Sequence, residues 1–362
     1  MTDAARRVIA GRGAVTNPAG RFATEDIIAV DDGWHAEALP ASVATELRAE
    51  AAKSIITRNA SPDIPFDRSA NPYRGCEHGC IYCYARPAHA YVDLSPGLDF
   101  ETRIFYKADA ERLLVSELSK PGYQCRPIAL GTNTDPYQPV ERRLRITRSL
   151  LEVLSEYEHP VTITTKGIGV LDDLDLLADM ARRNLVSVAV SITTLEDSLK
   201  RTLEPRTASA AARLRAVSAL RAAGIPVGVM TAPIIPAVND AELEGMLEAA
   251  AAAGAQRANW ILLRLPNEVA PLFRAWLDAH FPERAEHVMS LLRQSRSGRV
   301  NDPRFGSRMR GQGVFAALIA ERFRIAARRL GLSDRSPRLD ASAFRQPAAA
   351  QSGGQTPQIE LF

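Results

Sequence analysis

Three of the four cysteines in this 362-residue chain lie within eight consecutive positions. Residues 75–83 read GCEHGCIYC, which spaces Cys76, Cys80 and Cys83 as C-x3-C-x2-C. Thiolates bind metal ions and iron–sulfur clusters, so a loop that supplies three of them predicts a metal-dependent site. The two glycines of this loop, Gly75 and Gly79, allow the backbone to approach a bound group closely.

Three kinds of site are compatible with this spacing. A structural zinc ion takes four protein ligands, so His78 or His89 would have to complete the set. A redox dithiol would use Cys80 and Cys83 and leave Cys76 without a role. A [4Fe-4S] cluster held by three cysteines leaves one iron open to an outside ligand, which converts an electron carrier into a catalyst.

Composition places the cysteines in a large protein that we expect to be cytoplasmic. With 46% hydrophobic residues, the chain can bury one large α/β domain or two ordinary ones. It has no apolar run near the ~18 to 20 residues that span a membrane, and its first residues lack the apolar core of a secretory signal. Four cysteines in such a chain favour metal or redox use over disulfides.

Between about residues 68 and 267, short apolar segments alternate with amphipathic ones. The pattern predicts strands within 126–135, 160–167, 185–194, 225–235 and 257–266, and helices over 141–157, 171–183, 208–223 and 240–253. Segments rich in Val, Ile and Thr that alternate with helices indicate βαβ units and a parallel sheet. With the segment before Cys76 as the first strand, we expect an α/β fold, a partial (β/α)6 TIM-like barrel.

The remaining sequence divides the chain into four parts. Residues 1–65 are expected to form an irregular N-terminal extension with a short helix near 41–53, followed by the barrel at 66–268. Residues 269–345 are predicted to be an Arg-rich helical C-terminal extension, with helices at 270–280, 283–293 and 313–331. Residues 346–362 are a tail, flexible because it is rich in Gln, Gly, Ser and Pro, that ends in QIELF.

Polar residues follow several of the predicted strands. The segments are GTNTDP at 131–136, TTKG at 164–167 and SITT at 191–194. In parallel α/β folds the carboxyl ends of the strands lie on one side of the sheet, where the chemistry takes place. The cysteine loop follows the first strand on that side, so we expect the thiolates and these polar groups to share one site.

The cysteine loop, with aromatic Tyr82 before the third cysteine, resembles the signature of the radical S-adenosylmethionine (SAM) superfamily. NPYRGCEHGCIYCYARPAHAY, GTNTDPYQPVE and TTKG are most similar to its spore photoproduct lyase-like (DNA-repair-photolyase-like) branch, over about residues 65–270. The resemblance implies a [4Fe-4S] cluster on Cys76, Cys80 and Cys83, with SAM on the open iron. It implies cleavage of SAM to a 5′-deoxyadenosyl radical that abstracts hydrogen, and an electron donor such as flavodoxin or ferredoxin.

The resemblance also implies residues that contact SAM at the ends of the second and third strands. The candidates for the amino group of SAM are Thr132, Asn133, Thr134 and Asp135, which stand where the family usually has Gly-Gly-Glu. Lys166, at the end of the third strand, is the candidate for the carboxylate of SAM.

Three further candidates follow the fourth strand. Ser191 and Thr193 suit the ribose hydroxyls of SAM. Arg206, in LEPRT, could frame the adenine or close the mouth of the barrel.

Cys125 lies outside the cysteine loop, and some radical enzymes use a free thiol as a hydrogen donor. It precedes the polar turn after the second strand by about six residues, which in a strand is roughly 20 Å. We therefore expect a buried structural cysteine at the opposite end of the barrel, away from the chemistry.

The C-terminal part suggests nucleic acid as a partner. From Arg293 to Arg345 there are thirteen arginines, no lysines and four acidic residues, although the formal net charge of the whole chain is only +3. Such a stretch can bind a phosphate backbone, or it can form a solvated helical face.

The tail peptide QIELF resembles the motif by which bacterial DNA-processing enzymes bind the sliding clamp. In that motif Gln358 would hydrogen-bond, and Leu361 and Phe362 would fill an apolar groove. A fold-back of the tail onto the core is the alternative.

The sequence thus favours a cytoplasmic radical SAM enzyme that acts on a nucleic-acid base and has DNA as a partner. A second hypothesis keeps the radical chemistry but has a protein or a small metabolite as the substrate. A third is a non-catalytic, zinc- or cluster-stabilised adaptor that binds the sliding clamp.

Overall fold

The computed structural model of the protein describes residues 8–23, 43–335 and 338–347. Its main element is a seven-stranded sheet with the strand order β10-β9-β8-β7-β6-β3-β2. The six parallel strands are β3 (Arg68–Ala70), β6 (Ile128–Leu130), β7 (Val161–Thr165), β8 (Val186–Ser191), β9 (Val227–Ile234) and β10 (Arg257–Leu262). Since β10 and β2 (Ile56–Arg58) end the order, the sheet is an open, partial barrel, which confirms the predicted fold class.

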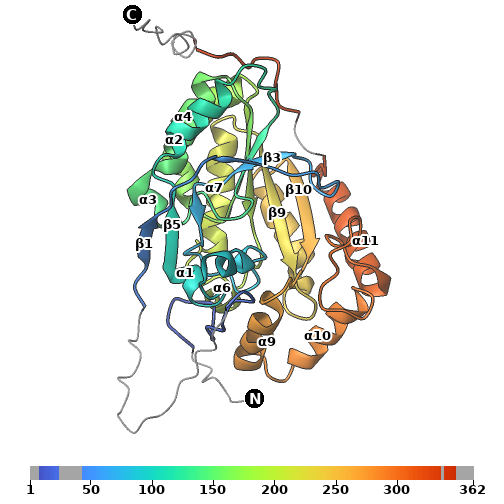
Figure 1. The fold of residues 1–362 in the computed structure, drawn as a ribbon. Coiled ribbons are helices and arrows are strands. Elements are labelled where there is room, and N and C mark those ends of the chain that lie inside the picture. Colours follow the sequence, from blue (N-terminus) through green and yellow to red (C-terminus); the bar gives the residue numbers. More distant parts are fainter. Residues whose placement is uncertain (1–7, 24–42, 336–337, 348–362) are drawn as a thin grey trace, which may run out of the picture.

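Helices connect the parallel strands, as the alternating pattern predicts. Those between β3 and β10 are η1 (Arg86–Val92), α1 (Asp99–Thr102), α2 (Ala110–Leu118), α3 (Glu141–Leu144), α4 (Ile146–Glu156), η2 (Ile168–Asp173), α5 (Leu174–Arg182), α6 (Asp197–Leu203), α7 (Ala210–Ala222), η3 (Asp240–Glu242) and α8 (Leu243–Ala252). In α4, the buried residues Ile146, Leu150 and Leu154 recur every four positions, which places them on one face of the helix. Such faces cover the sheet (Figure 1).

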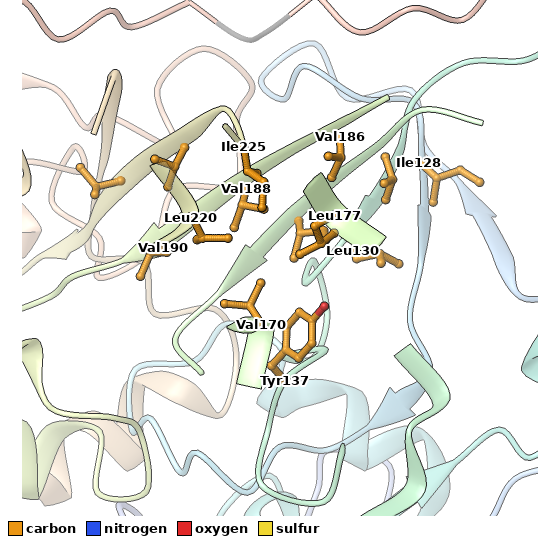
Figure 2. Packing of buried hydrophobic residues seen from close by; sticks show 14 of the residues in the cluster. Ile128, Leu130, Tyr137, Val170, Leu177, Val186, Val188, Val190, Leu220 and Ile225 are labelled. Atoms are coloured by element: carbon orange, nitrogen blue, oxygen red, sulfur yellow. The ribbon is translucent and has the colours of Figure 1, made fainter. Parts of the chain in front are cut away.

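The core lies between the sheet and these helices. Strand β8, with the sequence VSVAVS, is buried along almost its whole length, as expected for a parallel strand that is covered on both faces. Figure 2 shows Val186 and Val188 of this strand together with Leu177 of α5 and Leu220 of α7. This packing fixes the strand ends that carry the polar residues.

A small second sheet corrects one prediction about the N-terminal region. Its order is β1-β5-β4, with β1 (Glu46–Ala49), β5 (Arg103–Tyr106) and β4 (Tyr73–Arg74). The predicted helix near 41–53 is wrong over its described residues, because this segment forms β1 and pairs in parallel with β5. Helix propensity in a short segment is a weak preference that pairing with a distant strand can override.

The C-terminal region is helical, as predicted, and lies beside β10 (Figure 1). Its helices are α9 (Val269–His280), α10 (Ala285–Gln294) and α11 (Gly313–Arg329). The segment between α10 and α11 lies along β10, where the Leu262 N–H donates to the Met309 carbonyl at 2.9 Å. Among the described residues, no helix has the length and apolar character needed to cross a membrane.

Candidate active site

The cysteine loop connects β4 to η1 and is packed inside the protein. Cys76 and Cys80 are buried, and Cys83 is partly buried. Gly75 and Gly79 have φ angles of +82° and +68°, a left-handed backbone that favours glycine. A Cβ atom at these positions would lie 2.9 Å and 2.8 Å from neighbouring side-chain atoms, so the loop needs both glycines for close packing.

The three thiols form one group in an environment that suits bound iron. Burial raises the pKa of each thiol, and for Cys76 the nearby Asp135, Cys80 and Cys83 raise the pKa further. The backbone N–H groups of Asp135 and Ala85 donate to the sulfurs of Cys76 and Cys83, which favours the thiolate form. Buried thiolates need a positive partner, and the irons of a cluster supply it.

A single zinc ion fits the site less well. Within residues 8–23, 43–335 and 338–347, no three His, Cys, Asp or Glu side chains are arranged to hold one metal ion. A cubane cluster does not require this, because each of its cysteines binds a different iron. His89, a possible fourth zinc ligand, has its Nε2 3.0 Å from the Arg103 carbonyl, and its buried Nδ1 has no hydrogen-bond partner in the described part of the chain.

A buried arginine holds the shape of the cysteine loop. The Arg86 guanidinium donates to the carbonyls of Cys80 at 2.9 Å and Gly79 at 3.2 Å. It also pairs with Glu101 at 2.5 Å, and neither side chain is exposed. Glu101 in turn accepts hydrogen bonds from the backbone N–H groups of residues 13 and 14, so the described N-terminal segment lies against the loop.

The end of β6 contacts the cysteine loop, as predicted. The Thr134 hydroxyl donates to the Gly75 carbonyl at 2.7 Å. The Thr132 hydroxyl and the Asn133 N–H both donate to the Asn71 side-chain oxygen, at 3.3 Å and 3.0 Å. These bonds place the polar turn after β6 beside the first cysteine.

Asp135 joins the ends of β6 and β7. Its carboxylate accepts hydrogen bonds from the Thr165 hydroxyl at 2.6 Å and the Lys166 N–H at 2.7 Å. Burial alone would raise the pKa of Asp135, but the nearby His78 and these hydrogen bonds lower it to about 2. An ionised Asp135 therefore fixes the position from which the Lys166 side chain extends.

Glu204, a buried carboxylate that the sequence did not single out, lies at the centre of several candidate side chains. Thr193 donates to it at 2.7 Å, Tyr82 also donates to it, and Arg213 pairs with it at 2.7 Å. The Lys166 Nζ lies 3.9 Å from Glu204. Burial raises the pKa of Glu204, but the two cations and the hydrogen bonds from Tyr82 and Thr193 together outweigh this effect and lower it to about 2.

Lys166 lies between this carboxylate and the cysteines. Its charge acts to lower the pKa of both Cys80 and Cys83, so the ammonium group is near their sulfurs. Its Nζ is 5.7 Å from the centre of the Tyr82 ring. The chain therefore brings Lys166, Thr193 and the cysteine loop together at one site.

Ser191 and Arg206 have different surroundings. Ser191 is buried, and its carbonyl accepts a hydrogen bond from Arg213 at 2.7 Å. The Arg206 guanidinium lies 3.2 Å from Glu77, within the cysteine loop. Arg206 is thus positioned over the loop rather than at the end of β8.

Cys125 lies just before β6, at the end of the strand opposite to the polar turn, as predicted. The expectation that it is buried is wrong, because the residue is partly exposed. It belongs to the irregular segment before the strand, where packing is less complete. Burial of the thiol still raises its pKa, to about 12.

Comparison with known proteins identifies the family. The family model of the Radical SAM superfamily matches residues 70–250, half of the chain. This range contains the cysteine loop and the polar ends of β6, β7 and β8. The chain belongs to the radical SAM superfamily. It is a radical SAM enzyme, and membership implies both SAM and an iron–sulfur cluster as cofactors.

Two relatives of this radical SAM protein show how far the similarity extends. An uncharacterized protein of Mycobacterium tuberculosis is 39% identical over 233 residues, which cover 64% of this chain and 68% of that protein. An uncharacterized protein of Methanocaldococcus jannaschii is 28% identical over 172 residues, covering 48% and 62% of the two chains.

Solved structures of spore photoproduct lyase share the fold. The lyase in complex with dinucleoside spore photoproduct superimposes with a TM-score of 0.57, covering 80% of this chain and 81% of the lyase at 16% identity. A variant with bound AdoMet and the same dinucleoside gives the same TM-score and identity. At this identity the comparison shows that the two proteins share a fold.

Proposed function

We propose that Cys76, Cys80 and Cys83 hold three irons of a [4Fe-4S] cluster and leave the fourth iron for SAM. The observation that supports this most is the group of three mutually close thiols, two buried and one partly buried, on one loop at the carboxyl ends of the strands. When reduced, the cluster and SAM together supply a 5′-deoxyadenosyl radical that abstracts hydrogen from a substrate. The chain's own part is to hold both groups and exclude water.

Lys166 and its neighbours are the proposed binding site for SAM. Lys166 is a partly buried cation beside Cys80, so it suits the carboxylate of SAM. Glu204 limits where Lys166 and Thr193 can move and leaves Thr193 able to accept a ribose hydrogen bond. Asn133, at the end of β6, remains the proposed partner of the amino group.

The remaining candidates for SAM contacts differ in how free their polar groups are. The carboxylate of Asp135 accepts from Thr165 and Lys166, and the Thr134 hydroxyl both donates to Gly75 and accepts from Gln138, so we propose that Asp135 and Thr134 position the site. The Thr132 hydroxyl donates to Asn71 and can still accept, so Thr132 is proposed, with Asn133, for the amino group. Ser191 is proposed for the ribose, and Arg206 for the rim of the cofactor site.

We propose a nucleic-acid base as the substrate. Support comes from the fold shared with spore photoproduct lyase, which has been solved with a dinucleoside. The Arg-rich region supports this less than its composition suggests, because many of its arginines pair with acids of this chain, for example Arg308 with Asp63 at 2.5 Å and Arg322 with Glu244 at 2.6 Å. A protein or small-metabolite substrate is the alternative.

Three further proposals concern the cellular setting. The protein is cytoplasmic, because its sequence favours reduced cysteines, and it takes electrons from a flavodoxin or ferredoxin. The tail binds the bacterial sliding clamp through Gln358, Leu361 and Phe362, which lie outside the described residues. Titration of the clamp with the full chain and with a chain that lacks 358–362 tests this; equal binding or none contradicts it.

Anaerobic reconstitution tests the proposed chemistry. We expect about four irons per chain and the formation of 5′-deoxyadenosine from SAM only when a reductant is present. Cys76→Ala should lose both, whereas the matched variant Cys125→Ala should keep both. Full 5′-deoxyadenosine formation by Cys76→Ala would exclude the proposed cluster ligands.

A further inference from the structure

Tyr84, directly after the last cysteine of the loop, lies near residues that follow two different strands of the sheet. Its hydroxyl donates to the Thr132 carbonyl at the end of β6, and the Arg264 guanidinium lies 6.0 Å from the ring centre. Arg264 follows β10, which is four strands away from β6 in the sheet. The Tyr84 residue is nevertheless 51% exposed, so one part of this aromatic surface faces solvent beside the cluster loop.

Arg264 is a partly buried cation without an oxygen acceptor in the described part of the chain. Its Nε is buried and has no hydrogen-bond partner there. Its Nη1 contacts the Met309 sulfur at 3.5 Å, and a thioether is only a weak acceptor. Burial lowers the pKa of Arg264 and the nearby Arg308 lowers it further, and these effects outweigh Tyr84 and Asp63, which raise it. This position therefore costs free energy unless an anion is added.

The other arginines that surround the end of β10 all have oxygen partners. Arg296 donates to the carbonyls of Leu262 and Leu263 at 3.0 Å and 2.6 Å. Arg310 donates to the Trp260 carbonyl at 2.6 Å, and Arg308 pairs with an aspartate. The contrast singles out Arg264 as the guanidinium that this part of the fold leaves for a ligand.

We propose that Arg264 binds a backbone phosphate of a single-stranded or extruded nucleic-acid segment, whose neighbouring base stacks on the exposed surface of Tyr84. A guanidinium matches a phosphate with two parallel hydrogen bonds. Aromatic rings beside a cation are the usual platform for unpaired bases. An enzyme that acts on a base must take it out of the stack, so such a platform next to the cluster loop suits the proposed substrate. The inference rests on that proposed function.

Binding of a labelled oligothymidine to the reconstituted full chain, measured by fluorescence anisotropy at several salt concentrations, tests the proposal. We expect Arg264→Gln to weaken binding about tenfold, because one charge-assisted hydrogen-bond pair is lost. The slope of log K against log salt should fall by about 0.7, the value for one phosphate of a single strand. Arg264→Lys, which keeps the charge, should keep the slope but bind more weakly than the wild type.

The matched control is Arg329→Gln. Arg329 pairs with Glu248 and belongs to α11, on the outside of the molecule (Figure 1), so its loss should leave affinity and slope unchanged. Iron content and the affinity for SAM are measured for every variant. If Arg264→Gln loses iron, the test uses Arg264→Lys instead, and a lower affinity of this variant for the oligonucleotide supports the proposal.

The possible failures are distinguishable. If the wild type binds the oligonucleotide and both Arg264 variants bind it equally well, the inference is wrong and the proposed function stands. If Arg264→Gln loses affinity for SAM but not for the oligonucleotide, the arginine serves the cofactor carboxylate instead, which also overturns the inference. If the wild type binds no oligonucleotide, the nucleic-acid substrate itself is wrong.

Discussion

The two sides of the barrel differ in whether their buried arginines have a carboxylate partner. On the side of the cysteine loop, Arg86 and Arg213 are fully buried, and each pairs with a fully buried carboxylate. On the side of β10, Arg264 contacts the Met309 sulfur and the Tyr84 ring and has no carboxylate partner in the described part of the chain. Removing one partner of a buried pair leaves an uncompensated charge, whereas a buried cation without a partner costs free energy until a ligand neutralises it.

The largest effect is expected from breaking the pair of Arg86 and Glu101. Arg86→Met leaves a buried carboxylate without its partner, so the free energy of unfolding should fall by about 3 to 5 kcal/mol. Urea unfolding of the metal-free protein, followed by circular dichroism, measures this. Arg112→Met is the matched control, because Arg112 and Asp109 form an exposed pair at 3.0 Å whose loss should be silent.

The double variant Arg86→Met/Glu101→Leu sharpens this test. Removing both charges should recover part of the lost stability, because the uncompensated carboxylate is gone. A single variant as stable as the wild type would show that the pair is not what holds the cysteine loop.

Lys166→Met should mainly affect SAM. Lys166 is separated from Glu204 by 3.9 Å, beyond hydrogen-bond distance, so little stability should be lost. Loss of a charged partner of the SAM carboxylate should weaken SAM binding about ten- to a hundredfold. Equilibrium dialysis of labelled SAM measures it, with the exposed Lys120→Met as control. Unchanged SAM affinity would remove Lys166 from the cofactor site.

Arg264→Met should change stability in the opposite direction to Arg86→Met. Replacing a partly buried, unpaired cation by an apolar side chain of similar length should raise the free energy of unfolding by about 1 kcal/mol. The same urea experiment measures it. A loss of stability would mean that Arg264 has a structural role, as Arg86 and Arg213 do.

The smallest effect is expected from Cys125→Ala. The residue is partly exposed and lies at the amino end of β6, so stability should change by less than about 1 kcal/mol and the yield of 5′-deoxyadenosine should stay the same. An inactive variant with a full complement of iron would make Cys125 part of the chemistry.

Most of the fold could be predicted from local patterns in the sequence. The five apolar segments became five of the six parallel strands, because a strand covered on both faces needs apolar residues along its length. The same logic placed Lys166 near the cysteines, since the ends of parallel strands share one side. The helix predicted near 41–53 was wrong because this segment pairs as β1 with β5, which is more than fifty residues away in the sequence.

Pairings between distant residues explain what the sequence could not reveal. Glu204 and Arg213 lie in unremarkable helical surroundings, and only the fold makes them a buried pair beside Tyr82. For the same reason, composition alone does not show how much charge in the Arg-rich region is free, because partners such as Asp63 and Glu244 come from other parts of the chain.

Electron paramagnetic resonance of the air-free, dithionite-reduced protein, together with its metal content, tests the central claim most directly. We expect about four irons per chain and the signal of a reduced [4Fe-4S] cluster that changes when SAM is added, since SAM binds the open iron. Zinc in place of iron, or a cluster signal that is the same with and without SAM, would contradict a cluster held by Cys76, Cys80 and Cys83 with one iron open.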